Sequence, residues 1–315
     1  ALQQENEIMT TKRKSSKKTT AKKATAKKAT KKTAKKRATP MRKPQAAFAL
    51  ATNARKPAQE RVKAFIEAPL AVCQSDENLQ ASLDVLRNPK EPIKVRLAAL
   101  QSLQAASFSV IQFEACREDY LAALREVVDD KNAELRQRAL GILARQKDGY
   151  SQKRLLEGLK EPDKALVAPE KALQLLSYDV HAEAYPVARD IVSEPPSPEA
   201  KREALRLLSA DASSAPMFEK LLRDKNEDRE IRQISAAALQ TVKPKKFEQQ
   251  ARELLLDKDE YDDIQATALT ALTQFGDEKN VAGDAALMKR VDQLGKGKSA
   301  KVKKPAKQFL NRYGK

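Results

Sequence analysis

The residues of this chain best suited to chemistry are lysines, and they are concentrated near its N-terminus. Residues 12–43 contain sixteen basic side chains and no acidic one, on a background of Ala, Thr, Ser and Pro. Clustered lysines bind nucleic-acid phosphates by releasing condensed counterions, whatever the base sequence. We therefore predict that this segment, the lysine tail, binds DNA or RNA through Lys12, Arg13, Lys14, Lys17, Lys18, Lys22, Lys23, Lys27, Lys28, Lys31, Lys32, Lys35, Lys36, Arg37, Arg42 and Lys43.

The composition of the lysine tail also bears on its structure. It offers too little apolar surface to offset the entropy of ordering, so we expect residues 1–45 to be disordered when free. The five lysine pairs between residues 17 and 36 would spiral around a helix, and no large apolar residue stands between them. Both features argue against a helix that lies on a membrane surface.

Two simpler functions of this N-terminal region stay open. The lysine tail could be a solubilising or targeting segment, and in a eukaryote residues 12–14 and 35–37 would suit nuclear import. Residues 1–8 precede Met9 and are interpreted as an upstream extension or an expression remnant, to which we assign no function.

Charge is distributed unevenly along the rest of the chain. Residues 1–57 have a net charge of +16, residues 58–288 of −7 and residues 289–315 of +9. The acidic middle disfavours close contact with phosphates, so we expect its ligand to be a protein, a basic protein included. The basic C-terminal end predicts a second phosphate contact at Lys296, Lys298, Lys301, Lys303, Lys304 and Lys307.

The remaining reactive residues are too few for most catalytic sites. Cys73 and Cys116 are isolated in sequence and lack CxxC spacing, so we interpret them as buried thiols rather than a disulfide or metal pair. His181 is the one histidine, and we predict a capping or surface role at the start of a helix. No ligand set for a metal and no Walker phosphate loop is present. We expect no cofactor and no enzymatic activity.

The elements that position these residues are predicted by a repeated nine-residue frame. In each frame an apolar or alanine anchor is followed by a small residue at position +4 and a leucine at position +8. The anchors are Val95, Leu135, Ala168, Ala200, Ile231, Ile264 and Val302; the small residues are Ala99, Ala139, Ala172, Ala204, Ser235, Ala268 and Ala306; the leucines are Leu103, Leu143, Leu176, Leu208, Leu239, Leu272 and Leu310.

Positions 0, 4 and 8 lie on one face of a helix, so each frame presents an apolar stripe with a small residue at its centre. A small residue there allows another helix to approach closely. One such helix every 31–40 residues is typical of a repeat array, in which no unit buries its apolar face alone. We predict an N-terminal helical cap over residues 46–74 and the array, with a basic C-terminal cap, over residues 75–315.

A second helix, the outer helix, is expected before each frame. The apolar pattern predicts one around residues 79–86 and further ones over 113–128, 150–160, 182–193, 213–223, 245–256 and 277–294. Residues 108–113 add either a longer outer helix or an ordered loop. Ser197 before Pro198 predicts a capped helix start. Pro169 and Pro305 lie inside frames, so those helices should start late or kink.

The frame and its preceding turn resemble the second helix of short HEAT repeats, in which an acid lies shortly before a Val-Arg pair. Acids or Asn five residues before the anchor are Asp130, Asp163, Asn226 and Asp259; bases one residue after it are Arg96, Arg136, Lys201 and Arg232. The resemblance implies an all-α fold, a right-handed α-solenoid of about six to seven HEAT-like hairpins, with these acids and bases as a structural ladder between repeats. Lys90, Pro195, Pro169 and Gln265 depart from the pattern.

Residues 19–36 resemble the Lys/Ala/Thr tails of linker histones and of bacterial nucleoid proteins. The function we expect is a non-enzymatic adaptor that binds nucleic acid through the lysine tail and a protein through the solenoid. The alternative is a scaffold or enzyme accessory similar to the HEAT-containing phycobilisome lyases, with an incidental tail. With no apolar run long enough for a membrane span or a signal sequence, we expect an intracellular location: nucleoid or cytoplasm in a bacterium, nucleus in a eukaryote.

Overall fold

The chain divides into two units, residues 1–41 and residues 42–315. This computed structural model describes residues 43–314. The segment predicted to be disordered, residues 1–45, therefore lies outside the described residues up to residue 42. Within residues 43–314 every regular element is a helix and no strand occurs, as the frame pattern predicts.

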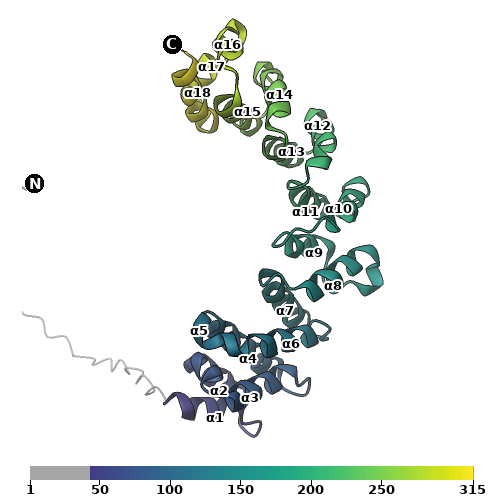
Figure 1. Cartoon of the computed structure of the whole chain (residues 1–315), viewed down its shortest axis with the longest axis vertical. Coiled ribbons are helices and arrows are strands. Elements are labelled where there is room, and N and C mark those ends of the chain that lie inside the picture. Colours follow the sequence, from purple (N-terminus) through teal and green to yellow (C-terminus); the bar gives the residue numbers. More distant parts are fainter. Residues whose placement is uncertain (1–42, 315) are drawn as a thin grey trace, which may run out of the picture. The chain divides into compact units, whose positions relative to one another are not determined.

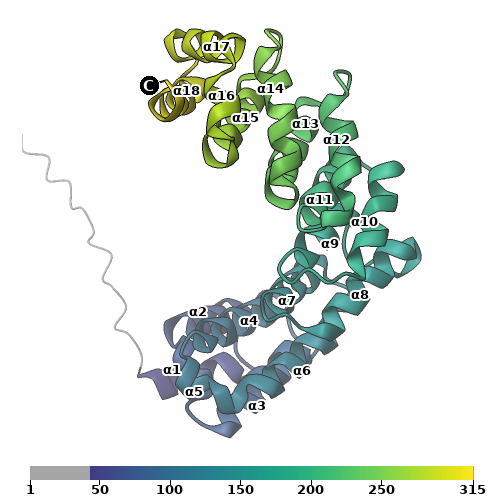
Figure 2. The ribbon, with the colours of Figure 1, turned by 45° about the horizontal axis from the view of Figure 1, so that its top comes forward.

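Helices of the second unit stack as pairs, each made of an outer helix and the frame helix that follows it (Figure 1). Taken by itself, this unit is a curved row of two layers, with the frame helices on its inner side (Figure 2). The pairs are α3 (Asp76–Arg87) with α4 (Ile93–Ser107), α6 (Arg117–Val127) with α7 (Ala133–Arg145), α8 (Gly149–Lys160) with α9 (Pro169–Leu176), α10 (Ala184–Ser193) with α11 (Pro198–Leu208), α12 (Ala215–Arg223) with α13 (Arg229–Val242), α14 (Pro244–Leu256) with α15 (Asp262–Phe275), and α17 (Ala285–Lys296) with α18 (Ala300–Tyr313).

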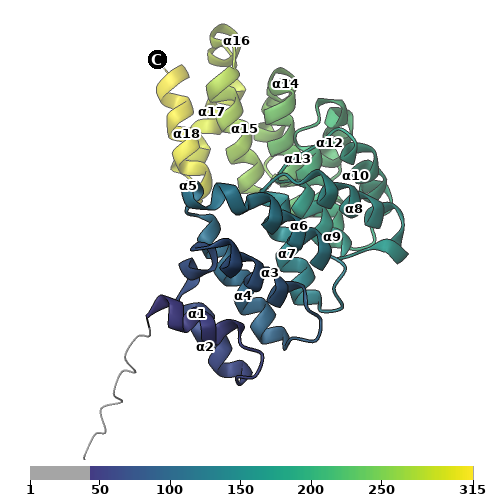
Figure 3. The ribbon, with the colours of Figure 1, turned by 60° about the horizontal axis from the view of Figure 1, so that its bottom comes forward.

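The region expected to be a cap is itself a helical pair. It consists of α1 (Pro44–Thr52), α2 (Ala58–Glu67) and the 3-10 helix η1 (Pro69–Cys73). Helix α2 packs on the frame helix α4, and α1 packs on α3 (Figure 3). The cap thus continues the two layers of the array.

The small residues at the centre of the frames are all at most 3% exposed, as are six of the seven leucines and five of the seven anchors; a sixth anchor, Ile231, is 4% exposed. Two exceptions have local causes. Ala168 is exposed because the helix begins only at Pro169, which leaves Ala168 as its N-cap. Leu310 is half-buried on α18, beyond which the structure describes no further pair of helices.

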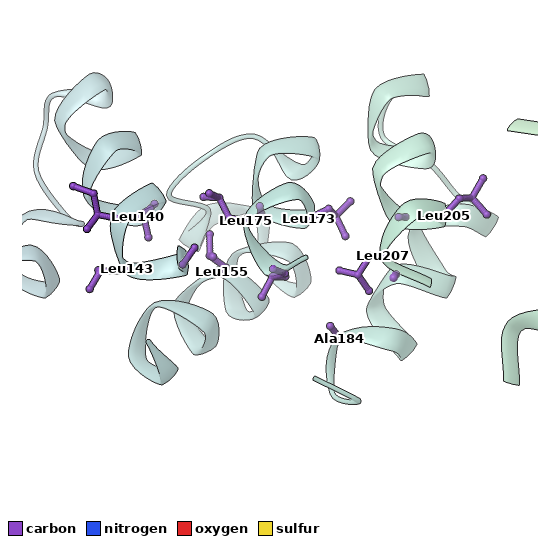
Figure 4. Packing of buried hydrophobic residues seen from close by; sticks show 14 of the residues in the cluster. Leu140, Leu143, Leu155, Leu173, Leu175, Ala184, Leu205 and Leu207 are labelled. Carbon is purple, nitrogen blue, oxygen red and sulfur yellow. The ribbon is translucent and has the colours of Figure 1, made fainter. Parts of the chain in front are cut away.

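Leucines from neighbouring pairs join these stripes into one core. Around α7 to α11, Leu140, Leu173 and Leu205 alternate with residues of the outer helices such as Leu155 and Ala184 (Figure 4). All five are at most 2% exposed. Burial of one leucine contributes about 1.5–3 kcal/mol relative to exposure, so separation of one pair from its neighbour would cost several such contacts.

Two outer helices differ from their predicted ranges. The range 113–128 begins with a short α5 (Val110–Phe113) and a 3-10 turn, η2 (Glu114–Cys116), before α6. The range 277–294 is two helices, α16 (Glu278–Ala282) and α17, because Asp284 caps α17 by accepting a hydrogen bond from the backbone N–H of Leu287 at 3.0 Å. The other outer helices agree within two or three residues, and 3-10 turns η3 (Pro162–Lys164) and η4 (Ala212–Ser214) complete the connections.

The prolines behave differently from one another. Helix α9 starts late at Pro169, as expected, and Ser197 caps α11 by accepting from the backbone N–H of Ala200 at 3.0 Å. Of the late start or kink expected at Pro305, the late start does not occur, because α18 begins at Ala300 and continues through the proline. Pro305 has no N–H to donate to the carbonyl one turn earlier.

Ion pairs between neighbouring pairs of helices form the expected ladder only in part. A rung, as used below, joins a base on one frame helix, or on α2, to an acid in the turn before the next frame helix. Arg96 reaches Asp130 at 2.7 Å, and this hydrogen bond helps to hold the pKa of Asp130 below its usual value although burial acts to raise it. Arg136, however, donates to the backbone carbonyls of Leu166 and Asp130, and Asp163 is exposed, so that expected rung is absent among the described residues.

Three rungs use a glutamate one residue later than the predicted acid position. Lys201 binds Glu227 at 2.7 Å rather than Asn226. Arg232 binds both carboxylate oxygens of Glu260, at 2.7 and 2.8 Å, rather than Asp259. The longer glutamate side chain at this inner turn position reaches the base, whereas the residue before it points to solvent.

The third of these rungs was missed in the sequence because it starts in the cap. Arg61 of α2 binds Glu91, directly after the non-acidic Lys90. In Arg61, Arg96 and Arg232 alike, Nε donates at 2.9 Å to the carbonyl ten residues earlier. Each arginine thus fixes the end of its own outer helix and the turn of the next pair.

The frames predict that enlarging a central small residue damages the array. Ala139→Leu or Ala268→Leu should lower the free energy of unfolding by about 1–3 kcal/mol, because both sites are 0% exposed. The exposed Gln101→Leu should change it by less than about 0.5 kcal/mol. Thermal melts of the three variants test this; identical melting of all three with the parent would show that the frames are wrongly aligned.

The rungs predict a strong contrast between two adjacent acids. Glu260→Ala leaves Arg232, which is 2% exposed, without its carboxylate, so the free energy of unfolding should fall by about 3–5 kcal/mol. Asp259→Ala, at the exposed neighbouring position, should cost less than about 0.5 kcal/mol. Urea unfolding measures both, and equal effects would contradict the assigned rung.

Candidate functional site

The lysine tail, the main predicted nucleic-acid interface, lies almost wholly outside the described residues. Of its sixteen basic residues only Lys43 is described, and it is exposed, directly before α1. The positions from Lys12 to Arg42 therefore stay predictions from sequence.

The second predicted contact is described in full at the end of α17 and on α18. All six lysines of this C-terminal lysine face, Lys296, Lys298, Lys301, Lys303, Lys304 and Lys307, are exposed. Lys296 pairs with Asp292 at 2.7 Å, and within residues 43–314 the other five have no ion pair. No acidic residue follows Asp292 in the chain. The face thus carries positive charge that no neighbouring carboxylate neutralises.

Helix α18 presents its four lysines of this face, Lys301, Lys303, Lys304 and Lys307, because its opposite face is firmly packed. Val302, Ala306, Phe309 and Tyr313 are each at most 3% exposed. The hydroxyl of Tyr313 lies 2.7 Å from the carbonyl oxygen of Leu272 and anchors the last turn to α15. At 100° per residue, the lysines of α18 point away from this buried stripe.

A polar groove that sequence analysis did not predict crosses the inner layer. Its cavity of about 560 Å³ is lined by Gln137, Ala168, Glu170, Lys171, Gln174, Glu199, Arg202, Glu203, Arg206 and Glu230, from α7, α9, α11 and α13 or the residues just before them. A second cavity of about 330 Å³ continues it along α13 and α15, lined by Asp228, Arg229, Glu230, Gln233 and Asp263.

Charges in this groove largely pair with one another. Arg202 lies 2.7 Å from Glu199 and 3.4 Å from Glu230, and Arg206 also binds Glu230 at 2.7 Å. Arg229 binds Asp263 at 2.9 Å in the continuation. Such exposed pairs contribute about 0–1 kcal/mol each and exchange partners at little cost, which suits recognition of a polar protein segment.

The single histidine lies in the turn before α10, three residues ahead of the helix start. His181 is exposed, and its Nε2 lies 3.1 Å from Oδ2 of Asp179. In the part of the chain that the structure describes, no group of three or more His, Cys, Asp or Glu side chains is arranged to hold a metal ion. Among the same residues, no helix is both long and apolar enough to cross a lipid bilayer.

Both cysteines are free thiols, as expected: Cys116, at the end of η2, is buried, and Cys73, at the end of η1, is half-buried. The two lie close enough for Cys116 to affect the pKa of Cys73. Burial, and then the adjacent Cys116, raise the pKa of the Cys73 thiol to about 12. Sequence analysis did not predict this proximity, because the two residues lie on separate turns.

Comparison with known proteins leaves the family open. No family model matches the sequence, and no curated protein matches it. One solved structure with a similar arrangement is the crystal structure of an engineered protein; it is 14% identical, with 86% of this chain and 89% of that chain covered and a TM-score of 0.43.

The raised pKa predicts that Cys73 reacts slowly with thiol reagents. Since the thiolate is the reactive form, the native protein at pH 7.5 should react at least about a hundredfold more slowly than free cysteine, whose pKa is about 8.5. Absorbance after addition of a chromogenic disulfide measures this rate, with urea-unfolded protein as the control that should titrate two thiols. Rapid labelling of the native protein at Cys73 would contradict the environment described.

Proposed function

We propose that this chain is a non-enzymatic adaptor that binds nucleic acid through its lysine tail and a protein through its helical array. The observation that carries the proposal is the run of sixteen basic residues without an acid between positions 12 and 43. Nucleic acid is the polyanion that suits such a run best, because each lysine that binds a phosphate releases condensed counterions.

The array supports the second half of the proposal. Its repeated frames and its Arg96, Lys201 and Arg232 rungs favour a right-handed solenoid of about six to seven HEAT-like hairpins. Solenoids of this kind offer extended surfaces to proteins. The groove along α7 to α15 has more acids than bases, so it disfavours phosphate and favours a polar or basic protein segment.

The proposed location follows from the proposed ligand. A chain that binds nucleic acid would lie inside the cell, in the nucleoid or cytoplasm of a bacterium or in the nucleus of a eukaryote. The Lys12–Lys14 and Lys35–Arg37 clusters would then serve nuclear import in the second case.

Binding through the tail should be steeply salt-dependent and nearly independent of base sequence. If about half of the sixteen charges engage duplex phosphates, log K should fall against log salt with a slope near −7, at about −0.9 per contact. Titration of unrelated DNA and RNA duplexes at several salt concentrations measures this slope.

The decisive variant replaces the ten paired tail lysines by glutamine: Lys17, Lys18, Lys22, Lys23, Lys27, Lys28, Lys31, Lys32, Lys35 and Lys36. It should lose most of the affinity, whereas single Lys→Ala changes should matter little because neighbouring pairs substitute for one another. Equal binding by parent and decisive variant, or a slope near zero, would overturn the proposal. A stoichiometric protein or chromophore that copurifies in place of nucleic acid would favour a scaffold of the lyase-like class.

A further inference from the structure

The two strongly basic segments of this chain are attached at opposite ends of the row of helices. The lysine tail leads into α1, which contacts only α2, α3 and η1 extensively, whereas α18 contacts α15, α16 and α17. Six steps between adjacent frame helices separate α4 from α18 (Figure 1), or about 50–60 Å along the row. The two attachment points thus lie at the two ends of a row that is several times longer than the Debye length of about 8 Å at physiological salt.

The frame of α18 shows why its lysine face is open. Lys303 occupies the position at which Arg96 and Arg232 bind the acid of the next turn. No further turn follows among the described residues, and Lys303 is exposed without an ion pair. Lys301, Lys304 and Lys307 lie on the same solvent side, opposite the buried Val302–Tyr313 stripe. Among the described residues, this side of α18 is therefore a cationic surface.

Between these ends the array repels phosphate. Residues 58–288 have a net charge of −7. Four carboxylates in the turns before frame helices, Glu91, Asp130, Glu227 and Glu260, are held in place by rungs. A duplex is therefore disfavoured along the body of the row and favoured at its two ends.

We infer that the C-terminal lysine face is a second duplex-binding site, and that one molecule bridges two nucleic-acid duplexes, one on the lysine tail and one on α18. The inference rests on the proposed function of the tail. Five free lysines can make at most five phosphate contacts against about eight for the tail, so the second site is the weaker and the more easily lost as salt rises.

The test uses the full chain and short duplexes of 12 base pairs, about 41 Å long, which cannot extend along the whole row. Donor- and acceptor-labelled duplexes are mixed at 50 mM salt, and energy transfer between them reports bridging. Transfer should rise and then fall as protein exceeds duplex, because separate molecules then occupy separate duplexes.

Two variants that lose the same number of positive charges distinguish the effect of where the lysines lie from the effect of the total charge. In the first, the five free lysines of the lysine face, Lys298, Lys301, Lys303, Lys304 and Lys307, become glutamine. In the matched control, five exposed lysines of the body without ion pairs, Lys131, Lys153, Lys160, Lys220 and Lys258, become glutamine. Bridging should fall at least tenfold in the first variant and stay within about twofold in the control, while both bind a single duplex within about threefold of the parent.

Several outcomes would overturn the inference. Undiminished bridging by the α18 variant would show that the tail alone links duplexes, and an equal loss in the control would show that only net charge matters. Loss of thermal stability in the α18 variant with full bridging would assign these lysines to capping the end of the array. The proposed function fails separately, if the variant with the neutralised tail binds a single duplex as tightly as the parent.

Discussion

The small residue at the centre of each frame is the constraint on which the array depends. Because Ala99, Ala139, Ala204 and their counterparts are buried in a closely packed core, a larger side chain there must displace the side chains or helices packed against it. Each pair then buries its leucines only in the presence of the next. The positions of every functional surface follow, since the groove lies on the solvent side of four frame helices and the lysine face on the solvent side of the last.

Features with a local period were predictable, and features set by turns were not. The buried columns of anchor, small residue and leucine follow from 3.6 residues per turn, and they were confirmed except at Ala168 and Leu310. The acids of the rungs depend on the path of each turn, so the sequence placed two of them one residue too early. Arg61 lies 35 residues before Arg96, within the repeat interval, and that spacing was the available signal for the missed rung.

Of the two candidate surfaces, one was likewise predictable from the sequence and the other was not. The lysine face was predicted from composition, and helical periodicity could also have shown that Lys301, Lys304 and Lys307 oppose the buried stripe. The groove was missed because it combines residues from frames about 30 positions apart. Its local signal is the spacing of Glu199, Arg202, Glu203 and Arg206 by three or four residues, which places them on one helix face.

The distribution of rungs has a mechanical consequence. Rungs join α2, α4 and α7, and again α11, α13 and α15, whereas among the described residues none joins α7 to α9, α9 to α11 or α15 to α18. Apart from hydrogen bonds such as those from Arg136 to the carbonyl of Leu166 and from Tyr313 to the carbonyl of Leu272, the frame helices at these steps meet through apolar side chains, and apolar contacts have no preferred direction, unlike charged hydrogen bonds. Under tension along the row, the steps without a rung, on both sides of α9 and between α15 and α18, are therefore expected to lengthen first.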